Sequence, residues 1–266
     1  MSIKNDTKEG EKLDTYNDFA QVYDLFMEDI PYDEWISYLE AVWKNYDFKP
    51  KLIAELGCGT GNITHRLAKK GYDMIGIDVS DTMLLQAREK AVQEKQDILY
   101  LLQDMREFEL YGTVDCIISL CDSLNYITDE NDLLEVFKLV NNYLEPNGLF
   151  IFDMNTEYKF KEVLGNNTFA ETEEAAAYIW ENFYDEEEKI NEYYVSFFIK
   201  DKKSQMYRKF EEEHYERAYG LETVKKLLDK AGLKFLAVYD AFTFDVPRAE
   251  SERIYFIAQE IKKNKK

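Results

Sequence analysis

The chain has 266 residues, of which 45% are hydrophobic and 32% are charged. This composition excludes a disordered chain, and the length suits one large domain, alone or with an inserted subdomain. The chain has 33 lysines and arginines against 53 aspartates and glutamates, a net charge of -20. That charge disfavours nucleic acid and anionic membranes as partners, promotes solubility, and would attract a cationic substrate such as an amine.

Signals of export, membrane insertion and metal binding are not apparent in the sequence. No apolar run reaches the roughly 20 residues of a membrane span, and the polar residues 1–14 do not resemble a signal peptide. Cys58, Cys116 and Cys121 form no Cys-x-x-Cys pair, and the chain has 2 histidines. We therefore expect a cytoplasmic protein with no metal site and no disulfide framework.

The first half of the chain has the pattern of an α/β domain. Residues 16–27 carry apolar side chains at helical spacing before Pro31, and a second helical stretch covers residues 32–46. Short apolar runs then alternate with amphipathic runs, which indicates a parallel sheet covered by helices. The predicted strands are residues 51–56, 73–78, 98–102, 114–120 and 149–153, with helices over 62–70, 82–93 and 130–144.

The pattern changes after residue 156. Residues 177–184, 190–200 and 205–219 form three long strand-like segments joined by polar turns, which indicates an antiparallel meander. The α/β pattern then returns, with a helix over 221–231 and strands over 234–241 and 253–260.

These patterns predict two structural units. One α/β domain comprises residues 1–156 and 220–266, and an antiparallel β subdomain over residues 157–219 is inserted into it. The inserted subdomain is expected either to cap a substrate pocket or to form the contact of a homodimer.

A glycine-rich turn, Glu-Leu-Gly-Cys-Gly-Thr-Gly over residues 55–61, follows the first strand and precedes a helix. Glycines permit positive φ angles and close approach of a ligand, and a helix start offers amide donors to an anionic group. The dinucleotide fingerprint Gly-x-Gly-x-x-Gly fits imperfectly, because Asn62 takes the place of its third glycine. We interpret the turn as a cofactor-binding loop.

Acidic residues end the next two predicted strands. Asp78 lies about 20 residues beyond the loop, where a carboxylate can accept hydrogen bonds from both hydroxyls of a ribose. This position would serve NAD equally well. Asp104 follows the third strand. Either acid could instead be a helix cap or a turn residue, but together with the loop they favour a cofactor that contains a nucleoside.

The turn and the two acids resemble those of class I S-adenosylmethionine-dependent methyltransferases, and the resemblance extends from about Tyr16 to the end of the chain. It implies a Rossmann-like sheet with helices on both faces and S-adenosylmethionine as cofactor. In this family the turn wraps the methionine part of the cofactor, the acid at Asp104 receives the adenine amino group, and the next backbone amide faces a ring nitrogen. The cofactor-binding residues that the resemblance implies are Tyr23, Glu55, Gly57, Cys58, Gly59, Gly61, Asp78, Val79, Met83, Asp104, Met105 and Cys121.

Residues 119–126, Ser-Leu-Cys-Asp-Ser-Leu-Asn-Tyr, follow the fourth strand. In the family this segment lines the sulfonium and the substrate. The Asn/Asp-Pro-Pro-Tyr form of N-methyltransferases that act on nucleic acids or glutamine is absent here. The form present is similar to that of small-molecule enzymes, including the sugar amine N-methyltransferases of antibiotic pathways.

Three residues are candidates for catalysis. The resemblance places Tyr16 and Tyr23 on a lid helix over cofactor and substrate, although their aromatic side chains could equally pack on the core. His214 could act as a general base, since imidazole groups titrate near neutral pH, or could be a surface or packing residue. Asn125 lies in the segment that lines the substrate. The catalytic candidates are thus Tyr16, Asn125 and His214.

We therefore expect a methyltransferase that acts on a small-molecule acceptor, with an amine preferred. The first alternative is an NAD(P)-dependent oxidoreductase, which fits Asp78 but leaves Asp104 unexplained. The second is a non-catalytic protein that binds the cofactor.

Overall fold

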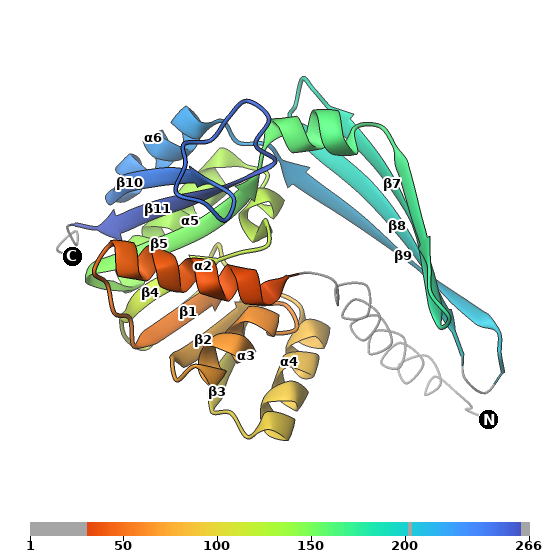
Figure 1. Cartoon of the computed structure of the whole chain (residues 1–266), viewed down its shortest axis with the longest axis horizontal. Coiled ribbons are helices and arrows are strands. Elements are labelled where there is room, and N and C mark those ends of the chain that lie inside the picture. Colours follow the sequence, from red (N-terminus) through yellow and green to blue (C-terminus); the bar gives the residue numbers. More distant parts are fainter. Residues whose placement is uncertain (1–30, 202–203, 262–266) are drawn as a thin grey trace, which may run out of the picture.

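The computed structural model describes residues 31–201 and 204–261. Within these residues, a seven-stranded sheet has the order β10-β11-β5-β4-β1-β2-β3, and a second sheet has four strands (Figure 1). Strands β1 to β5 run parallel, whereas β11 is antiparallel to both β5 and β10. The strands are β1 (Leu52–Leu56), β2 (Asp73–Asp78), β3 (Ile98–Leu102), β4 (Val114–Ser119), β5 (Leu144–Asn155), β10 (Leu233–Asp240) and β11 (Arg253–Glu260).

This strand order fixes where a ligand can bind. The chain moves from β1 outward to β3 and then returns to place β4 on the other side of β1. In open α/β sheets, ligands occupy the crevice at the carboxyl ends of the strands where the order reverses. The glycine-rich turn leaves the carboxyl end of β1, and residues 119–126 leave that of β4. The two segments therefore meet at this point.

Helices cover both faces of the large sheet. One buried apolar cluster packs helices α5 and α6 on β5 and β11, and another packs α2 and α3 on the opposite face. Alternate residues of β4 enter the two clusters, which explains its apolar sequence. The α-helices described are α2 (Tyr32–Asn45), α3 (Asn62–Lys69), α4 (Asp81–Glu94), α5 (Glu130–Tyr143) and α6 (Leu221–Ala231).

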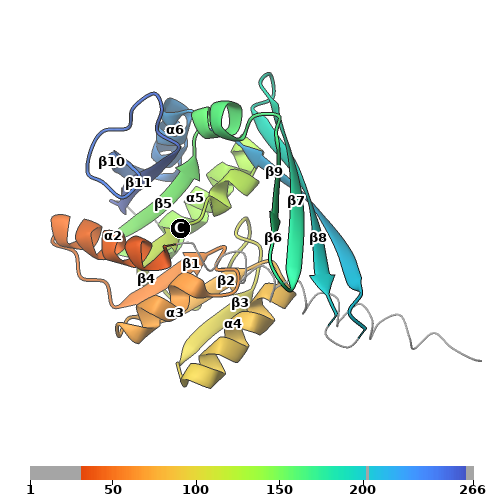
Figure 2. The same ribbon diagram turned by 45° about the vertical axis from the view of Figure 1, so that its right-hand side comes forward.

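The second sheet stands to one side of the first and has the antiparallel order β6-β7-β8-β9 (Figures 1 and 2). Its strands are β6 (Thr168–Thr172), β7 (Ala176–Asp185), β8 (Ile190–Lys200) and β9 (Tyr207–Arg217). The three long segments expected from the sequence are strands. The edge strand β6 and the π-helix η2 (Lys159–Leu164) were not predicted, because residues 157–172 show neither alternation nor a long apolar run.

Several predicted bounds differ from the structure by one or two residues, and the largest difference is at the start of β5. The helix expected over residues 130–144 ends at Tyr143, and β5 begins at Leu144 rather than at residue 149. Pro146 lies near the start of this strand, where its missing donor is tolerated, next to a register irregularity opposite β4. The helix expected over residues 16–27, with Tyr16 and Tyr23, lies outside the described residues.

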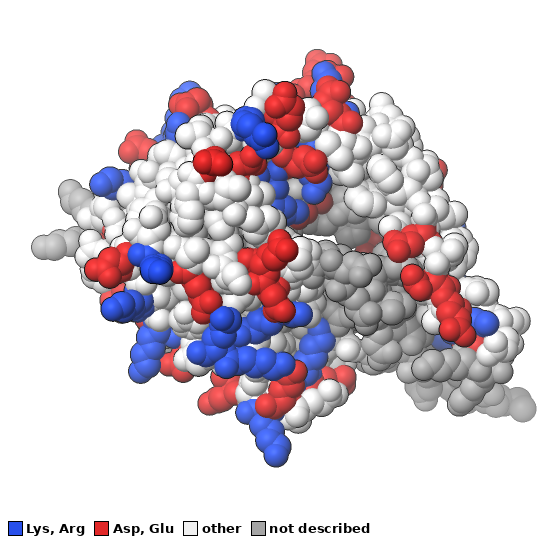
Figure 3. All heavy atoms as spheres, in the orientation of Figure 1, with Lys and Arg blue, Asp and Glu red and all other residues white. Residues whose placement is uncertain are grey.

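Charges of both signs are mixed on the surface (Figure 3). The basic side chains on and next to α3 pair with acids of neighbouring elements at 3.0, 2.7 and 2.8 Å. The pairs are Arg66–Asp33, Lys69–Glu94 and Lys70–Glu40.

Two buried asparagines join β7 and β8, and they generate a test of the inserted sheet. Each side-chain amide donates to the oxygen of the other, Asn182 to Asn191 at 2.9 Å and Asn191 to Asn182 at 3.0 Å. We expect Asn191→Ala to lower the free energy of unfolding by about 1–3 kcal/mol in chemical denaturation, because it leaves the buried Oδ1 of Asn182 without the donor it has in the wild type. The exposed neighbour Glu181 supplies the control, and an equal loss in Glu181→Ala would contradict this explanation.

Candidate active site

The glycine-rich turn is held open by its backbone conformation. Gly57, Gly59 and Gly61 have φ angles of 71°, 52° and 77°, a region that favours glycine. A β-carbon on Gly57 would lie 2.6 Å from Oγ of Ser123, so the turn and the segment after β4 approach too closely for any side chain there. Glu55 lies beneath the turn, buried and accepting a hydrogen bond from Thr64. Burial raises the pKa of Glu55 to about 8.

Asp78 joins the turn to the end of β2. Its Oδ2 accepts from the amide of Gly59 at 2.7 Å, and its Oδ1 accepts from the amide of Ser80 at 2.8 Å. The cap of α4 is Ser80, whose hydroxyl accepts from the amide of Met83. Asp78 is thus a strand-end acid and not the helix cap. Burial raises its pKa above the usual range of an aspartate.

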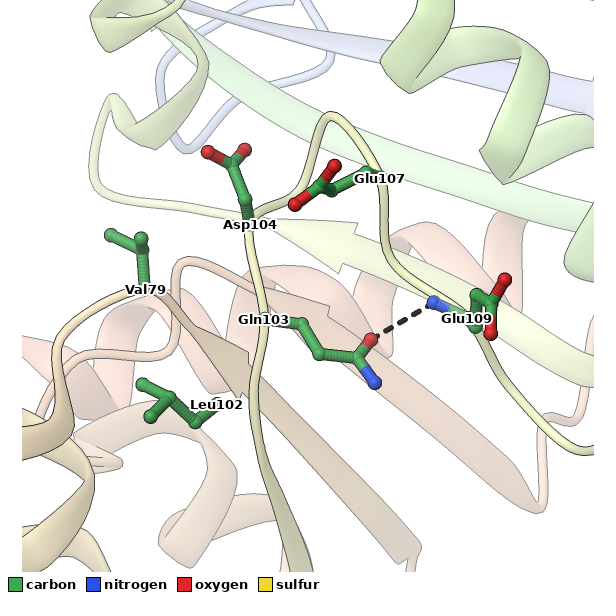
Figure 4. Close-up of a pocket in the computed structure, with 6 residues that line it drawn as sticks. All are labelled: Val79, Leu102, Gln103, Asp104, Glu107 and Glu109. Atoms are coloured by element: carbon green, nitrogen blue, oxygen red, sulfur yellow. Dashed lines mark hydrogen bonds between the residues drawn. The ribbon is translucent and has the colours of Figure 1, made fainter.

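Asp104 borders an open depression of about 430 Å³ at the ends of β2 and β3 (Figure 4). The side chains of Val79 and Asp104 project from these strand ends into the same region (Figure 4). The guanidinium of Arg106 holds Asp104 through Nε at 3.0 Å and Nη2 at 2.6 Å, which lowers the pKa of the carboxyl. The lining residues are Val79, Leu102, Gln103, Asp104, Glu107 and Glu109.

The segment after β4 has an unusual conformation that buried charges stabilise. Cys121 and Asp122 both have left-handed backbone, with φ angles of 58° and 55°. Their amides donate to the carboxylate of the fully buried Asp153, at 3.3 and 2.8 Å. Arg253 bridges the two acids, at 2.8 Å to Asp153 and 2.6 Å to Asp122. Such backbone persists only where its surroundings determine it.

Asn125 is fully buried and its amide is occupied by backbone groups. Its Nδ2 donates to the carbonyl oxygens of Asn155 and Arg217, at 3.2 and 2.8 Å, and its Oδ1 accepts from the amide of Asn155 at 3.0 Å. The side chain therefore clamps the segment after β4 to the ends of β5 and β9. Both of its donors are used in this clamp, so they are not available to an acceptor molecule.

His214 lies in a polar network on the inserted sheet. Its ring stacks on Tyr193, with centroids 4.6 Å apart and planes at 13°. Its Nδ1 lies 3.3 Å from the hydroxyl of Tyr126, and its Nε2 lies 3.1 Å from Glu212. Tyr193 donates to Glu216 at 3.0 Å.

Sequence reasoning missed Tyr193 and Glu216. The sequence held one signal for Glu216, because alternation along β9 places it on the same face as Glu212 and His214. The partner Tyr193 depends on the register between β8 and β9, which pairs it with His214.

The inserted sheet spans the carboxyl ends of the central strands. At one end Asn125 contacts Arg217 of β9. At the other end, Met83 at the start of α4 packs against the apolar cluster of Ala176, Val195 and Phe197. One face of the inserted sheet is thus joined to the body on both sides of the glycine-rich turn.

Within the described residues, none of the helices has the length and apolar character needed to span a membrane.

Comparison with known proteins identifies the family. Residues 53–148 match the family model of a methyltransferase domain. YqeM of Bacillus subtilis, a protein named as a methyltransferase, is 39% identical over 248 residues, which are 93% of this chain and 98% of YqeM. A crystal structure of an S-adenosylmethionine-dependent methyltransferase from Clostridium acetobutylicum has a TM-score of 0.84 at 33% identity, over 93% of this chain and 100% of that one.

A more distant structure shares the fold alone. The sugar N-methyltransferase KedS8 from Streptoalloteichus has a TM-score of 0.72 at 17% identity, over 90% of this chain and 93% of KedS8.

The fold and the strand-end site define a Rossmann-like enzyme that uses a cofactor containing a nucleoside. The chain belongs to the class I S-adenosylmethionine-dependent methyltransferases, and S-adenosylmethionine is its cofactor. This confirms the family and cofactor that the sequence predicted and sets aside the oxidoreductase alternative.

The position of Asp78 leads to a binding prediction. We expect Asp78→Asn to weaken S-adenosylmethionine binding about tenfold or more in calorimetric titration, because an amide is a weaker acceptor for ribose hydroxyls than a carboxylate. The affinity of the wild type for S-adenosylmethionine should fall on acidification. Burial raises the pKa of Asp78, so its carboxylate is protonated, and loses acceptor strength, at a higher pH than an ordinary aspartate. Asp73→Asn, at the exposed opposite end of β2, is the control. Equal affinity of the Asp78 variant and the wild type would remove Asp78 from the cofactor site.

Proposed function

We propose that this protein transfers the methyl group of S-adenosylmethionine to an amino group of a small-molecule acceptor. The observation that carries the proposal is the inserted sheet, which is joined to the body on both sides of the glycine-rich turn. We assign it the role of a cap over the acceptor rather than of a dimer contact, because its joined face carries the aromatic and polar groups next to residues 119–126.

The proposed cofactor position follows the strand ends. The glycine-rich turn above Glu55 would hold the methionine part, and Asp78 would accept hydrogen bonds from the ribose hydroxyls. Val79 and Asp104 would hold the adenine in the depression, with Arg106 as the neighbour that orients the Asp104 carboxylate. The close approach of Gly57 to Ser123 supports a sulfonium beside residues 119–126. Met83, Met105 and Cys121 complete the proposed contacts.

When bound, the cofactor supplies an activated methyl group on a sulfonium, so the protein mainly orients the acceptor and excludes water. Asn125 and Arg253 act as positioning residues, because they hold the segment after β4 in its left-handed conformation. An amine must be neutral to attack. An amine arrives mostly as a protonated cation. The groups beside residues 119–126 therefore have to bind this cation and also accept its proton.

Charge supports an amine. The buried and half-buried ionisable groups where the two sheets meet include the acids Asp122, Asp153 and Glu216 and the bases Lys159, Arg217 and Arg253, so the attraction for a cation comes from the charge of the whole protein. The net charge of -20 adds long-range attraction for a cationic acceptor. The fold shared with KedS8, whose name describes a sugar N-methyltransferase, adds support for the same chemistry.

Paired acceptors test this proposal. The protein is incubated with S-adenosylmethionine carrying a labelled methyl group and with compounds that differ only in an amino or hydroxyl group, such as glucosamine and glucose. We expect at least about tenfold higher kcat/KM for the amines, or ~1.4 kcal/mol of transition-state stabilisation. Preferential methylation of the hydroxyl compounds would contradict an amine acceptor. Tight cofactor binding without turnover of any acceptor would favour a non-catalytic protein.

A further inference from the structure

A continuous chain of hydrogen-bonding groups runs from a buried carboxyl to the surface. Tyr193 donates to Oε1 of Glu216 at 3.0 Å, and its hydroxyl also contacts the hydroxyl of Tyr126. The hydroxyl of Tyr126 lies 3.3 Å from Nδ1 of His214, whose Nε2 lies 3.1 Å from Glu212. The two hydroxyls and the imidazole can each accept a proton and donate one, and a carboxylate stands at each end of this series of groups.

The two ends of this chain differ in their access to water. Glu216 is 3% exposed, whereas the side chain of Glu212 is 29% exposed and Tyr126 is 42% exposed. The chain therefore connects an interior carboxyl with solvent. A carboxyl that served only to join the two sheets would not need this connection.

The buried end lies beside the proposed position of methyl transfer. Asn155, at the end of β5, donates to Oε2 of Glu216 at 3.5 Å and is itself clamped by Asn125. Asp122 is near enough to affect the titration of both Glu216 and Tyr193. Asp122 precedes Ser123, the residue that touches Gly57 of the glycine-rich turn. Through Asn155 and Asn125, hydrogen bonds thus link Glu216 to the segment after β4, whose Ser123 contacts Gly57 of the glycine-rich turn.

We propose that Glu216 accepts the proton that the acceptor nitrogen loses during methyl transfer, and that Tyr193, Tyr126 and His214 pass it to Glu212 at the surface. This inference rests on the proposed function. The nitrogen lone pair forms the new N–C bond, the S–C bond breaks, and its electron pair goes to sulfur to give neutral S-adenosylhomocysteine. The methylated nitrogen, now positive, loses one proton to the carboxylate of Glu216. Each hydroxyl then accepts a proton as it releases its own.

The surroundings of Glu216 suit a group that gains and loses a proton. Burial and the charge of Asp122 raise its pKa to about 8, while Tyr193, Asn155 and Lys159 act in the opposite direction. Lys159 lies at the start of η2, 3.1 Å from Oδ1 of Asn155, and burial lowers its own pKa. Arg253 of β11 is held between Asp122 and Asp153. Because the pKa of Glu216 is raised, its carboxylate form accumulates only as pH rises toward and above about 8.

The protonation of Glu216 can be measured without any acceptor. We expect the infrared difference spectrum of wild type minus Glu216→Gln to show the C=O stretch of a protonated carboxyl below neutral pH. The band should disappear as pH rises through about 8, and Tyr193→Phe should shift it by removing a hydrogen bond. Glu213→Gln, an exposed neighbour on β9, should leave it unchanged. No such band at any pH would show that Glu216 stays ionised, which overturns its role as a proton acceptor.

Kinetics with an amine that the wild type methylates test the relay itself. We expect kcat to fall about 10²-fold in Glu216→Gln, with a smaller fall in Tyr193→Phe and Tyr126→Phe and unchanged affinity for S-adenosylhomocysteine. The wild-type rate should rise with pH through about 8, and Glu216→Gln should keep only the part of this rise that the deprotonation of the amine itself produces. Tyr215→Phe is the matched control. The hydroxyl of Tyr215 donates to the exposed Glu213, which is not one of the groups that link Glu216 to the surface.

The two proposals fail in different ways. Amine methylation that is unaffected in Glu216→Gln and Tyr193→Phe overturns the relay and leaves the proposed function intact. If the wild type methylates no amine, the proposed function fails, and the role of Glu216 falls with it.

Discussion

The buried bridge of Arg253 to Asp122 and Asp153 is the interaction on which the geometry of the site depends. Asp153 is fully buried and would be costly as an isolated anion, so its charge requires both the guanidinium and the two backbone amides that it receives. Those amides belong to Cys121 and Asp122, whose left-handed conformation turns the chain toward the glycine-rich turn. One buried charge thereby sets the path of the segment that lies beside the cofactor.

The same segment also fixes the inserted sheet. Asn125, four residues beyond Cys121, bonds to the backbone of β5 and β9 together, so the cap is attached to the loop whose shape the bridge determines. The contact of Met83 with the inserted sheet provides the second attachment. The acceptor region is therefore bounded by elements that are held to one another and to the central sheet. This arrangement is suited to a reaction in which orientation and exclusion of water provide much of the rate.

The fold was largely predictable because its signals are local. The bounds predicted for β2, β3, α6 and β11 agree with the structure, since each is an apolar or amphipathic run ended by clear turn or cap residues. The fold class, the family and the cofactor were likewise confirmed. β6 and η2 were missed because their stability comes from packing on β7 and on the ends of the body, and their own sequence carries little periodicity.

The candidate site was predictable only in part, for a related reason. Glu55, Asp78 and Asp104 lie at strand ends, and strand ends follow from the sequence pattern. The pairs Tyr193–Glu216 and Asp122–Arg253 join residues that are not neighbours in the chain. A shift of one residue in the register of β8 or β9 would turn Tyr193 or Glu216 to the opposite face. The occupied amide of Asn125 also depends on tertiary contacts, and this changed our interpretation of Asn125 from substrate contact to clamp.

The central claim is that the cofactor's sulfur faces the junction of residues 119–126 with the inserted sheet. A crystal structure of the full chain with S-adenosylhomocysteine bound tests it most directly. We expect the ribose on Asp78, the adenine beside Val79 and Asp104, and the sulfur directed toward Asp122 and the Tyr193–Glu216 pair. A bound molecule with its ribose away from Asp78, or with its sulfur directed away from the inserted sheet, would contradict this arrangement.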